Sequence, residues 1–327
     1  MTKPVILQMG AYPEWDEQPL NAAYDVRRYF DAADKAAFLA ECGPQVSGIA
    51  TRGELGASRE IIEACPNLEV ISVYGVGYDA VDLAACRTRG IHVTNTPDVL
   101  TGDVADLGVA MMLAVSRGIV GAEAWVRSGD WAARGNYPLQ RRIWGKTAGI
   151  LGLGRIGFEI AQRLRGFGMD IAYCDVAARD HAPDLTFVAD PVALAHRSEF
   201  LFVALAAMAE TRNIVSDSVI EALGPNGVLI NVSRASNVDE EALIQALQDG
   251  RLGAAALDVF VGEPQIDPRL TTLPNVLLQP HQASGTIETR KAMGGESTEE
   301  MEVVGIDEGR STMVAAEAHG LAYRTEF

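Results

Sequence analysis

Apolar runs of four to seven residues alternate with amphipathic or alanine-rich segments in the first hundred residues of the chain. The runs predict buried strands, and the segments between them predict helices, the first with Asp31 as its N-cap. The strands are expected at residues 5–9, 24–30, 46–51, 68–73 and 91–94, and the helices at 31–41, 58–64 and 81–89. Such alternation is typical of a parallel sheet that is covered by helices on both faces.

The same alternation returns after residue 147 and continues to about residue 293. Strands are expected at 148–153, 171–174, 200–205, 227–232, 254–259 and 276–278, with helices at 156–167, 216–223, 239–249 and from Thr286 onward. The last helix is expected to return the chain to the first unit. Beyond Gly294 and Gly295 the pattern weakens, because residues 295–327 are acidic and have no clear apolar stripe.

Two segments of a different kind separate these regions. Residues 101–119 are small or apolar almost all round, which predicts a buried helix that links two domains. Residues 129–142 contain Trp131, Tyr137 and three arginines, which predicts an irregular, partly exposed arm. Because aromatic residues and arginine are enriched in subunit contacts, the arm is the reason to expect a homodimer.

The chain centres on residues 147–175, TAGILGLGRIGFEIAQRLRGFGMDIAYCD. A strand leads into Gly152, Gly154 and Gly157 in the spacing G-x-G-x-x-G, and a helix, a second strand and Asp175 follow. Gly152 permits a tight turn, Gly154 lets a pyrophosphate approach the backbone, and Gly157 lets the helix pack on the strand. The helix N-terminus offers N–H groups to the anion, and Asp175 can accept hydrogen bonds from the adenosine ribose. A glycine turn alone could be purely structural, but strand, helix and acid together predict a dinucleotide site.

Composition narrows the classes of ligand. The 327 residues include 44 acidic and 27 basic side chains, for a net charge of −17. This charge argues against nucleic acid or an anionic membrane as a partner, and an anionic substrate would need a local cation. Four cysteines without paired spacing fit buried thiols in a reducing cytoplasm. Neither a signal peptide nor an apolar run long enough to span a membrane is expected.

Three polar side chains follow predicted strands, where open α/β sheets bind their ligands. Arg234 follows GVLINVS, Glu263 follows AALDV and His281 follows VLLQP. The three suit the reversible reduction of a 2-keto acid by a nicotinamide cofactor. A protonated His281 would give a proton to the developing alkoxide, and Glu263 would orient the ring and favour the imidazolium. Arg234 would pair with the substrate carboxylate and polarise the carbonyl.

Each of these residues also has a plain structural interpretation. His281 could cap a backbone carbonyl, Glu263 could be a solvated turn acid, and Arg234 could be a surface cation. The sequence has no His, Cys and Asp spacing typical of a metal site, so no metal is expected. It also has no nucleophile elbow and no P-loop. The reductase chemistry therefore depends on whether the three side chains converge.

These motifs resemble those of the D-isomer-specific 2-hydroxyacid dehydrogenase family. GLGRIG, NVSRASNVDEEAL, GAAALDVFVGEP and LQPHQASGT occur in the family's order and spacing, and the resemblance covers about residues 40–293. It implies that Arg234, Glu263 and His281 are catalytic and that Asp258 contacts the nicotinamide carboxamide. One departure is SRAS, where the family usually has a glycine after the arginine.

The resemblance also implies a fold and a set of binding residues. The fold is α/β, with two Rossmann-like domains on parallel sheets. Residues 1–98 and 288–327 form a flavodoxin-like substrate domain, and 99–287 form an NAD-binding Rossmann domain inserted in it. The implied cofactor-binding residues are Thr101, Gly152, Gly154, Arg155, Ile156, Gly157, Asp175, Asp258 and Ser284. The implied substrate-binding residues are Arg52, Tyr74, Val76, Gly77, Arg234 and His281, with backbone N–H groups at Val76-Gly77 for the substrate carboxylate.

Three stretches narrow the resemblance to the glyoxylate, hydroxypyruvate and hydroxyphenylpyruvate reductases: TNTPDVLTGDVADL, ETRNIV and SGTIETRKAM. That subgroup often prefers NADP(H), with serine or arginine after the second strand of the cofactor domain. This chain has Asp175 there, which would repel a 2′-phosphate, and Arg179 is the one nearby cation that could offset it. NAD(H) is therefore the expected cofactor, with NADP(H) as the alternative.

Three functions compete. The first is the cytoplasmic reduction of glyoxylate or hydroxypyruvate to the D-2-hydroxy acid, with aryl pyruvates kept as alternative substrates. The second is an NADH-sensing binding module like the transcriptional corepressor of this fold, which would need no acid–base pair. The third is formate dehydrogenase, in which hydride transfer needs no acidic histidine supported by Glu263. The set Arg234, Glu263 and His281 favours the first.

Overall fold

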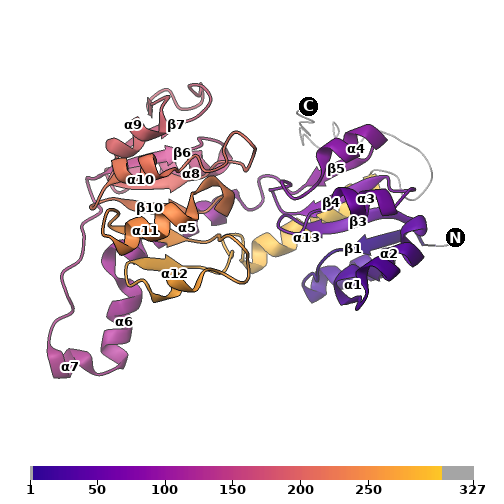
Figure 1. The fold of residues 1–327 in the computed structure, drawn as a ribbon, viewed down its shortest axis with the longest axis horizontal. Coiled ribbons are helices and arrows are strands. Elements are labelled where there is room, and N and C mark those ends of the chain that lie inside the picture. The colour runs from indigo at the N-terminus through magenta and orange to yellow at the C-terminus, as the bar shows by residue number, and fades with distance from the viewer. Residues whose placement is uncertain (1–2, 304–327) are drawn as a thin grey trace. The chain divides into compact units, whose positions relative to one another are not determined.

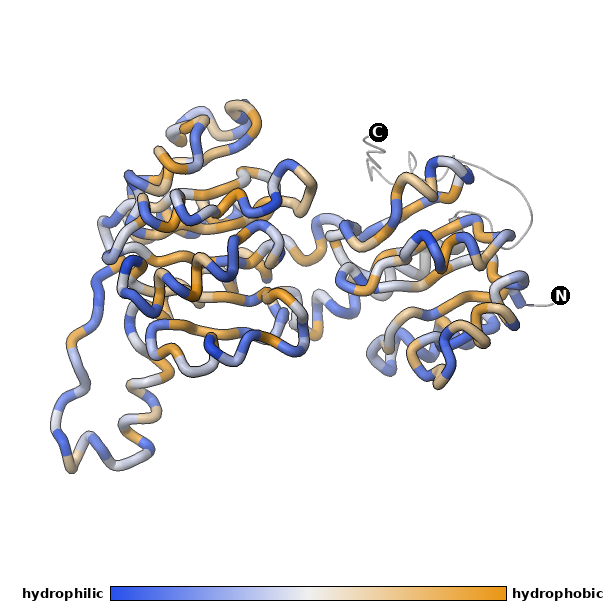
Figure 2. The backbone as a smooth tube through the Cα atoms, in the orientation of Figure 1, coloured by the Kyte–Doolittle hydropathy of each residue, from blue (hydrophilic) through white to orange (hydrophobic). Residues whose placement is uncertain are grey.

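The computed structural model describes residues 3–303, which form two compact units, each built on one sheet (Figure 1). The first unit contains the chain up to Leu100 and the chain from Thr286, and the second contains Thr101–Gly285. Both sheets are parallel throughout, which confirms the predicted α/β class with two Rossmann-like sheets. Figure 2 shows apolar residues along the strands and alternating polar and apolar residues along the helices.

The first unit has a five-stranded sheet in the order β2-β1-β3-β4-β5, the order of flavodoxin-like sheets. Its strands are β1 Val5–Gln8, β2 Asp25–Arg28, β3 Val46–Arg52, β4 Val70–Tyr74 and β5 His92–Asn95. Its helices are α1 Glu14–Ala23, α2 Lys35–Cys42, α3 Arg59–Ala64, α4 Leu83–Arg89 and α13 Ile287–Val303, with 3-10 turns η1 Tyr29–Asp31 and η2 Gly43–Gln45. Leu39, Ile62 and Ala85 of α2, α3 and α4 belong to one apolar cluster with Ile49 and Ile71 of the sheet.

The helix α13 packs on β4 and beside α1, as expected for a segment that returns to the first unit. It continues past Gly294 and Gly295 to Val303, and Ser297 in this part makes a polar contact with β4. The hydroxyl groups of Ser297 and Ser72 lie 2.8 Å apart, and both residues are buried. Residues 304–327, for which the sequence predicted no clear pattern, lie outside the described residues.

One prediction in this unit is wrong, and one helix was not predicted. Asp34 rather than Asp31 is the N-cap of α2, and its carboxylate accepts a hydrogen bond from the N–H of Ala37. Asp31 instead ends the 3-10 turn that follows β2. The sequence also gave no sign of α1, because Pro19 lies inside that helix and its buried residues, Asp16 and Leu20, make no apolar stripe.

The second unit has a seven-stranded sheet in the order β12-β11-β10-β9-β6-β7-β8. Its strands are β6 Thr147–Leu151, β7 Asp170–Cys174, β8 Thr186–Phe187, β9 Phe200–Val203, β10 Val228–Asn231, β11 Ala254–Leu257 and β12 Val276–Leu278. Its helices are α5 Thr101–Arg117, α6 Ile119–Arg127, α7 Asp130–Arg134, α8 Arg155–Arg165, α9 Pro191–His196, α10 Asp217–Leu223, α11 Glu240–Gln248 and α12 Pro268–Thr272, with a 3-10 turn η3 Ala235–Asn237. The strand order reverses at β6, which is where open α/β sheets bind nucleotides.

Helices cover both faces of this sheet. Leu194, Ile220 and Ile244 of α9, α10 and α11 share one apolar cluster with Leu201 and Leu229 of the sheet. On the other face α5 packs against α8. Arg163 of α8 links the two helices, because its guanidinium contacts the Asp106 carboxylate and the Gly102 carbonyl oxygen of α5.

The predicted irregular arm is partly helical. The helix that begins at Thr101 ends at Arg117, because Gly118 takes a φ of +58°, and α6 and α7 then project from the body of the unit (Figure 1). The Trp125 ring packs edge-on against Tyr137, with centroids 5.7 Å apart, and its Nε1 donates to the Gly135 carbonyl. Among the described residues no single helix is long and apolar enough to span a membrane; by length and composition alone α5 and α6 would pass together, with a 58° bend between them.

Candidate active site

The three expected catalytic side chains follow three neighbouring strands of the second unit. Arg234 follows β10, Glu263 follows β11 and His281 follows β12, and these strands are adjacent and parallel. Their carboxyl ends therefore share one edge of the sheet. Glu263 Oε2 lies 2.7 Å from His281 Nδ1. Arg234 follows the neighbouring strand at the same edge, and its positive charge contributes to lowering the pKa of Glu263.

The carboxylate of Glu263 is held from two sides. Its Oε1 accepts a hydrogen bond of 2.6 Å from the N–H of Phe260, and its Oε2 meets the imidazole. Burial raises the pKa of Glu263, but the hydrogen bonds from His281 and Phe260, with the charges of His281 and Arg234, outweigh burial and hold the pKa below its usual value. Glu263 is therefore an anion at neutral pH, and it favours a proton on His281 Nδ1.

The imidazole has one nitrogen left for a ligand. Because Glu263 occupies Nδ1, Nε2 is the atom that can exchange a proton with a substrate, and the His281 side chain is 31% exposed. The backbone of His281 has a φ of +51°, in the left-handed region that side chains other than glycine rarely adopt. Such a conformation persists only where surrounding contacts fix it.

Asp258 supplies those contacts. Its carboxylate accepts hydrogen bonds of 2.8 and 2.9 Å from the N–H groups of Gln282 and Ala283, directly after His281. Burial raises the pKa of Asp258, and the two hydrogen bonds offset part of the effect. The Asp258 side chain is only 1% exposed, and its two hydrogen bonds fix the backbone directly after His281. Its predicted contact with a nicotinamide stays a prediction.

A buried polar network that the sequence analysis missed shapes the Arg234 loop. Asn231 Oδ1 accepts from the N–H and the hydroxyl of Ser233, and its Nδ2 donates to the Arg234 carbonyl. Asn237 Nδ2 donates to Ser233 Oγ and to the Leu205 carbonyl. A polar residue at the end of a fully apolar strand, Asn231 after VLI, was the signal that could have revealed this network.

The three glycines of the glycine-rich turn differ in what requires them. Gly152 has a φ of +88°, and a Cβ on Gly157 would lie 2.0 Å from the Gly152 carbonyl oxygen, so protein packing requires both. A Cβ on Gly154 would meet no protein atom within 4 Å beyond its chain neighbours. Packing therefore does not require Gly154, whereas a ligand pressed against the turn would.

The start of α8 is equally suited to an anion. Gly154 is its N-cap and has no side chain to satisfy the first N–H groups of this 11-residue helix. Arg155 and Ile156 form the first turn, with Arg155 exposed. The turn thus combines open space with oriented N–H groups, which is the environment that a pyrophosphate needs.

Asp175 follows β7, next to the glycine-rich turn. Its Oδ2 accepts a hydrogen bond of 2.9 Å from the N–H of Leu153, inside that turn. Arg179 also binds the carboxylate with two nitrogens, at 3.0 and 2.7 Å. Burial raises the pKa of Asp175, but the hydrogen bonds from Arg179, Leu153 and Val176 outweigh burial and lower the pKa. The expected ribose acceptor is therefore an anion that is already paired.

Two further expected cofactor residues lie in the second unit. Thr101 is the first residue of α5, and Ser284 lies three residues after His281; both are partly exposed. Among the described residues no group of three or more His, Cys, Asp or Glu side chains could hold a metal ion.

The expected substrate residues of the first unit lie at the carboxyl ends of β3 and β4. Arg52 and Tyr74 are paired in register, and Val76-Gly77 follow in the next loop. The Val76 carbonyl accepts a hydrogen bond of 2.8 Å from Asn95 Nδ2, which fixes the loop. Arg52 forms an ion pair of 2.7 Å with Glu54.

Tyr74 lies in the interior of the first unit. Its side chain is 3% exposed, and its hydroxyl lies 3.0 Å from Asp16 Oδ2 and 2.6 Å from the Arg290 carbonyl oxygen. These contacts tie β4 to α1 and α13. The structure thus gives the Tyr74 side chain a packing role, and a direct contact with substrate gains no support from it.

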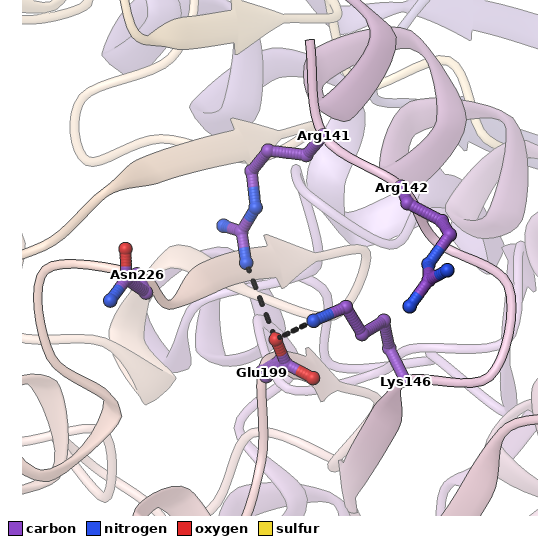
Figure 3. A pocket seen from close by; sticks show the side chains of 5 residues that line it. All are labelled: Arg141, Arg142, Lys146, Glu199 and Asn226. Carbon is purple, nitrogen blue, oxygen red and sulfur yellow. Dashed lines mark hydrogen bonds and ion pairs between the residues drawn. The ribbon is translucent and has the colours of Figure 1, made fainter.

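A separate recess of about 390 Å³ lies at the opposite edge of the second sheet (Figure 3). Its lining residues are Arg141, Arg142, Lys146, Glu199 and Asn226. Lys146 and Glu199 directly precede β6 and β9, so the recess lies at the amino ends of the strands. Lys146 Nζ lies 2.7 Å from Glu199 Oε1, and Arg141 lies 3.9 Å from the same oxygen. It contains none of the expected site residues.

Comparison with known proteins identifies the family. A model of the D-isomer specific 2-hydroxyacid dehydrogenase NAD-binding domain matches residues 109–283. The chain belongs to this family. A 2-hydroxyacid dehydrogenase structure from Ketogulonicigenium vulgare Y25 is 70% identical, with a TM-score of 0.86 over 93% of this chain and 95% of that one. The family predicted from the motifs is thereby confirmed.

Two other relatives bear on the subgroup. An NADPH-dependent glyoxylate/hydroxypyruvate reductase from Sinorhizobium meliloti, solved with NADP and malonate, is 40% identical, with a TM-score of 0.88 over 95% of this chain and 96% of that one. A hydroxyphenylpyruvate reductase from Plectranthus scutellarioides is 42% identical over 88% of this chain and 91% of its own length. The predicted subgroup and the oxidoreductase class are confirmed.

Proposed function

We propose that this protein reduces a small 2-keto acid, of the glyoxylate or hydroxypyruvate kind, to the D-2-hydroxy acid with NADH or NADPH. The observation that supports this most is the 2.7 Å contact between Glu263 and His281 on the sheet edge that also presents Arg234. A module that only senses NADH has no need of a half-buried carboxylate paired with an imidazole. Family membership supports the same conclusion.

We assign cofactor binding to the turn and the sheet edge of the second unit. The proposed residues are Thr101, Gly152, Gly154, Arg155, Ile156, Gly157, Asp175, Asp258 and Ser284. When bound, the reduced nicotinamide supplies the hydride for the carbonyl carbon. The N–H groups at the start of α8 hold the pyrophosphate, and the open space at Gly154 lets it approach the backbone. Both NAD(H) and NADP(H) are proposed as cofactors, since a relative binds NADP.

His281 is the proposed proton donor. As the carbonyl carbon is reduced, His281 Nε2 gives its proton to the carbonyl oxygen, and the imidazole becomes neutral. Glu263 keeps its charge throughout, stabilises the imidazolium before transfer and holds the ring in position through Nδ1. The ring then regains a proton from water, to which it is partly exposed. Arg234 pairs with the substrate carboxylate and polarises the carbonyl. Arg52 and the N–H groups of Val76-Gly77 stay as proposed substrate contacts.

A panel of substrates tests this proposal. The oxidation of NADH and of NADPH is followed by absorbance with glyoxylate, hydroxypyruvate, phenylpyruvate and 4-hydroxyphenylpyruvate. We expect turnover with at least one of the first two acids. Faster turnover with the aryl acids would favour the second candidate, a hydroxyphenylpyruvate reductase, which the 42% identity to such an enzyme supports. Tight cofactor binding without turnover of any acid would reject both.

We also propose that the protein is a cytoplasmic homodimer. The helix α6, the arm and the segment directly after the arm expose large apolar side chains, among them Val120, Val126, Trp131, Leu139 and Trp144. A second copy of the chain would cover them. All four cysteines are buried free thiols, which fits a reducing compartment. Light scattering should give twice the chain mass, and Trp131→Ser with Leu139→Ser should lower it; a monomeric wild type would contradict the dimer.

A further inference from the structure

We propose that Asn237 is a positioning residue for Arg234: its side-chain amide ties the loop that carries this arginine to the segment on which the glycine-rich turn rests. The arginine is thereby placed relative to the cofactor site. The inference rests on the proposed function in taking Arg234 as the group that binds the substrate carboxylate. Asn237 itself is fully buried and acts through other residues.

A tight turn brings Asn237 back to the start of its own loop. The 3-10 turn η3 begins directly after Arg234, and the N–H of Asn237 donates a hydrogen bond of 3.3 Å to the Arg234 carbonyl. Asn237 Nδ2 donates to Ser233 Oγ at 3.1 Å, and the Ser233 hydroxyl donates to Asn231 Oδ1 at 2.8 Å. Asn231 Nδ2 then donates to the Arg234 carbonyl at 3.1 Å. One continuous chain of hydrogen bonds therefore leads from the amide to the backbone of the arginine.

Ser233 also holds the side chain of Arg234. Its carbonyl oxygen accepts a hydrogen bond of 3.0 Å from Arg234 Nη1, and Ser233 is buried. A shift of the Ser233 backbone therefore moves the guanidinium that the substrate carboxylate must meet. Small shifts of this kind are costly, since a misplacement of about 1 Å can lower a rate about 100-fold.

The other end of the amide is fixed beneath the cofactor turn. Asn237 Nδ2 also donates a hydrogen bond of 3.1 Å to the Leu205 carbonyl oxygen. The segment after β9 packs on Gly152, where a Cβ would lie 2.9 Å from Leu205 Cδ2 and 3.0 Å from the Ala204 carbonyl oxygen. The N–H of Ala204 donates to the Leu151 carbonyl at 2.9 Å, which fixes the segment to β6 independently of the amide. The amide therefore joins a fixed point at the turn to the loop of the arginine.

Packing alone does not account for an asparagine at this position. Within residues 3–303, Asn237 Oδ1 has no hydrogen-bond partner, although the side chain is 0% exposed. An unpaired buried amide oxygen destabilises a fold, and a leucine of similar volume would avoid that cost. What asparagine adds is its two donor contacts, to Ser233 and Leu205.

Binding of oxalate tests the inference apart from turnover. Oxalate offers carboxylates to Arg234 but has no ketone that NADH could reduce. Its dissociation constant is measured at saturating NADH, by quenching of nicotinamide fluorescence, for wild type and Asn237→Leu. We expect the variant to bind oxalate about 5- to 50-fold more weakly, and the KM for hydroxypyruvate to rise by a similar factor. NADH should bind within about threefold of wild type, because Ala204 and Leu151 still support the turn.

Two further variants separate positioning from general destabilisation. Asn275 also donates to two carbonyl oxygens, those of Leu247 and Gly253, both at 3.3 Å, but it lies at the amino ends of the strands. Asn275→Leu should lower the melting temperature as Asn237→Leu does, without weakening oxalate binding. Ser233→Ala breaks the chain of hydrogen bonds at its middle and should weaken oxalate binding by itself. In that background Asn237→Leu should add less than about threefold.

The inference is overturned if Asn237→Leu binds oxalate within about twofold of wild type, or if wild type binds no oxalate. If Asn237→Leu does not fold, the same criterion applies to Ser233→Ala, which removes only one oxygen. Effects of the two substitutions that multiply in the double variant would also overturn it, because they would then act independently. Weaker oxalate binding by the variants of a protein that turns over no 2-keto acid would support the positioning role and reject the proposed function.

Discussion

Replacing Glu263 with glutamine tests how the active-site ion pair works. Glutamine keeps the shape of the side chain and an oxygen that can accept from His281 Nδ1, but it removes the negative charge. The imidazolium would then lose the anion that stabilises it, 2.7 Å away. Because the charged imidazole is the proposed proton donor, we expect the rate of reduction to fall.

The size of the effect follows from the contact. The two side chains are 31% and 25% exposed, so solvent screens the pair only in part. Hydrogen bonds to charged groups contribute about 1.5–3 kcal/mol, which corresponds to a loss of about 10- to 150-fold in kcat/KM.

The assay is steady-state reduction of hydroxypyruvate or glyoxylate over a range of pH, with NADH binding measured by fluorescence on the same samples. NADH affinity should stay within about twofold of wild type, since Glu263 is not assigned to the cofactor. A variant that keeps kcat/KM within about threefold of wild type, or that loses NADH affinity as much as it loses kcat/KM, would refute the reasoning.

Further predictions concern the turn, the histidine segment and acid stability. Gly154→Ala should weaken NADH binding without lowering the melting temperature, whereas Gly157→Ala, whose Cβ would lie 2.0 Å from a backbone oxygen, should destabilise the fold by about 1–3 kcal/mol. Asp258→Asn should lower kcat more than NADH affinity, because Gln282 and Ala283 each donate to a different carboxylate oxygen and the amide NH2 that replaces one of them cannot accept. The pKa of Asp175 is lowered on folding, so its contribution to stability is complete at neutral pH and is lost as pH falls below the ordinary carboxylate pKa. Asp175→Asn should therefore flatten the acid side of a plot of melting temperature against pH.

Local patterns explain why much of the site could be predicted from the sequence. The turn between β6 and α8 requires glycine at Gly152 and Gly157 for reasons of backbone geometry. The spacing of these glycines in the sequence therefore predicts the conformation of the turn. Arg234, Glu263 and His281 each follow an apolar run, and parallel strands bring such positions to one edge. The order of the parallel strands therefore places these three residues at the same edge of the sheet.

Other features depend on contacts between distant residues, which no local pattern encodes. Tyr74 is buried because α1 and α13 close over β4, and its partner Arg290 is 216 residues away. The Asn237 side chain of the buried network donates to the Leu205 carbonyl, which is 32 residues away in the sequence. For α2 the choice between Asp31 and Asp34 as N-cap was a local error, since both precede the same alanine-rich run.

The central claim is that His281 supplies the proton for reduction of a 2-keto acid. The most direct test compares turnover of hydroxypyruvate by wild type and His281→Ala at saturating NADH, with the dissociation constant of NADH measured on the same samples. We predict that turnover falls by about 10²- to 10⁴-fold while the NADH constant stays within about twofold. Turnover close to that of wild type, or an equal loss of turnover and cofactor binding, would contradict the account.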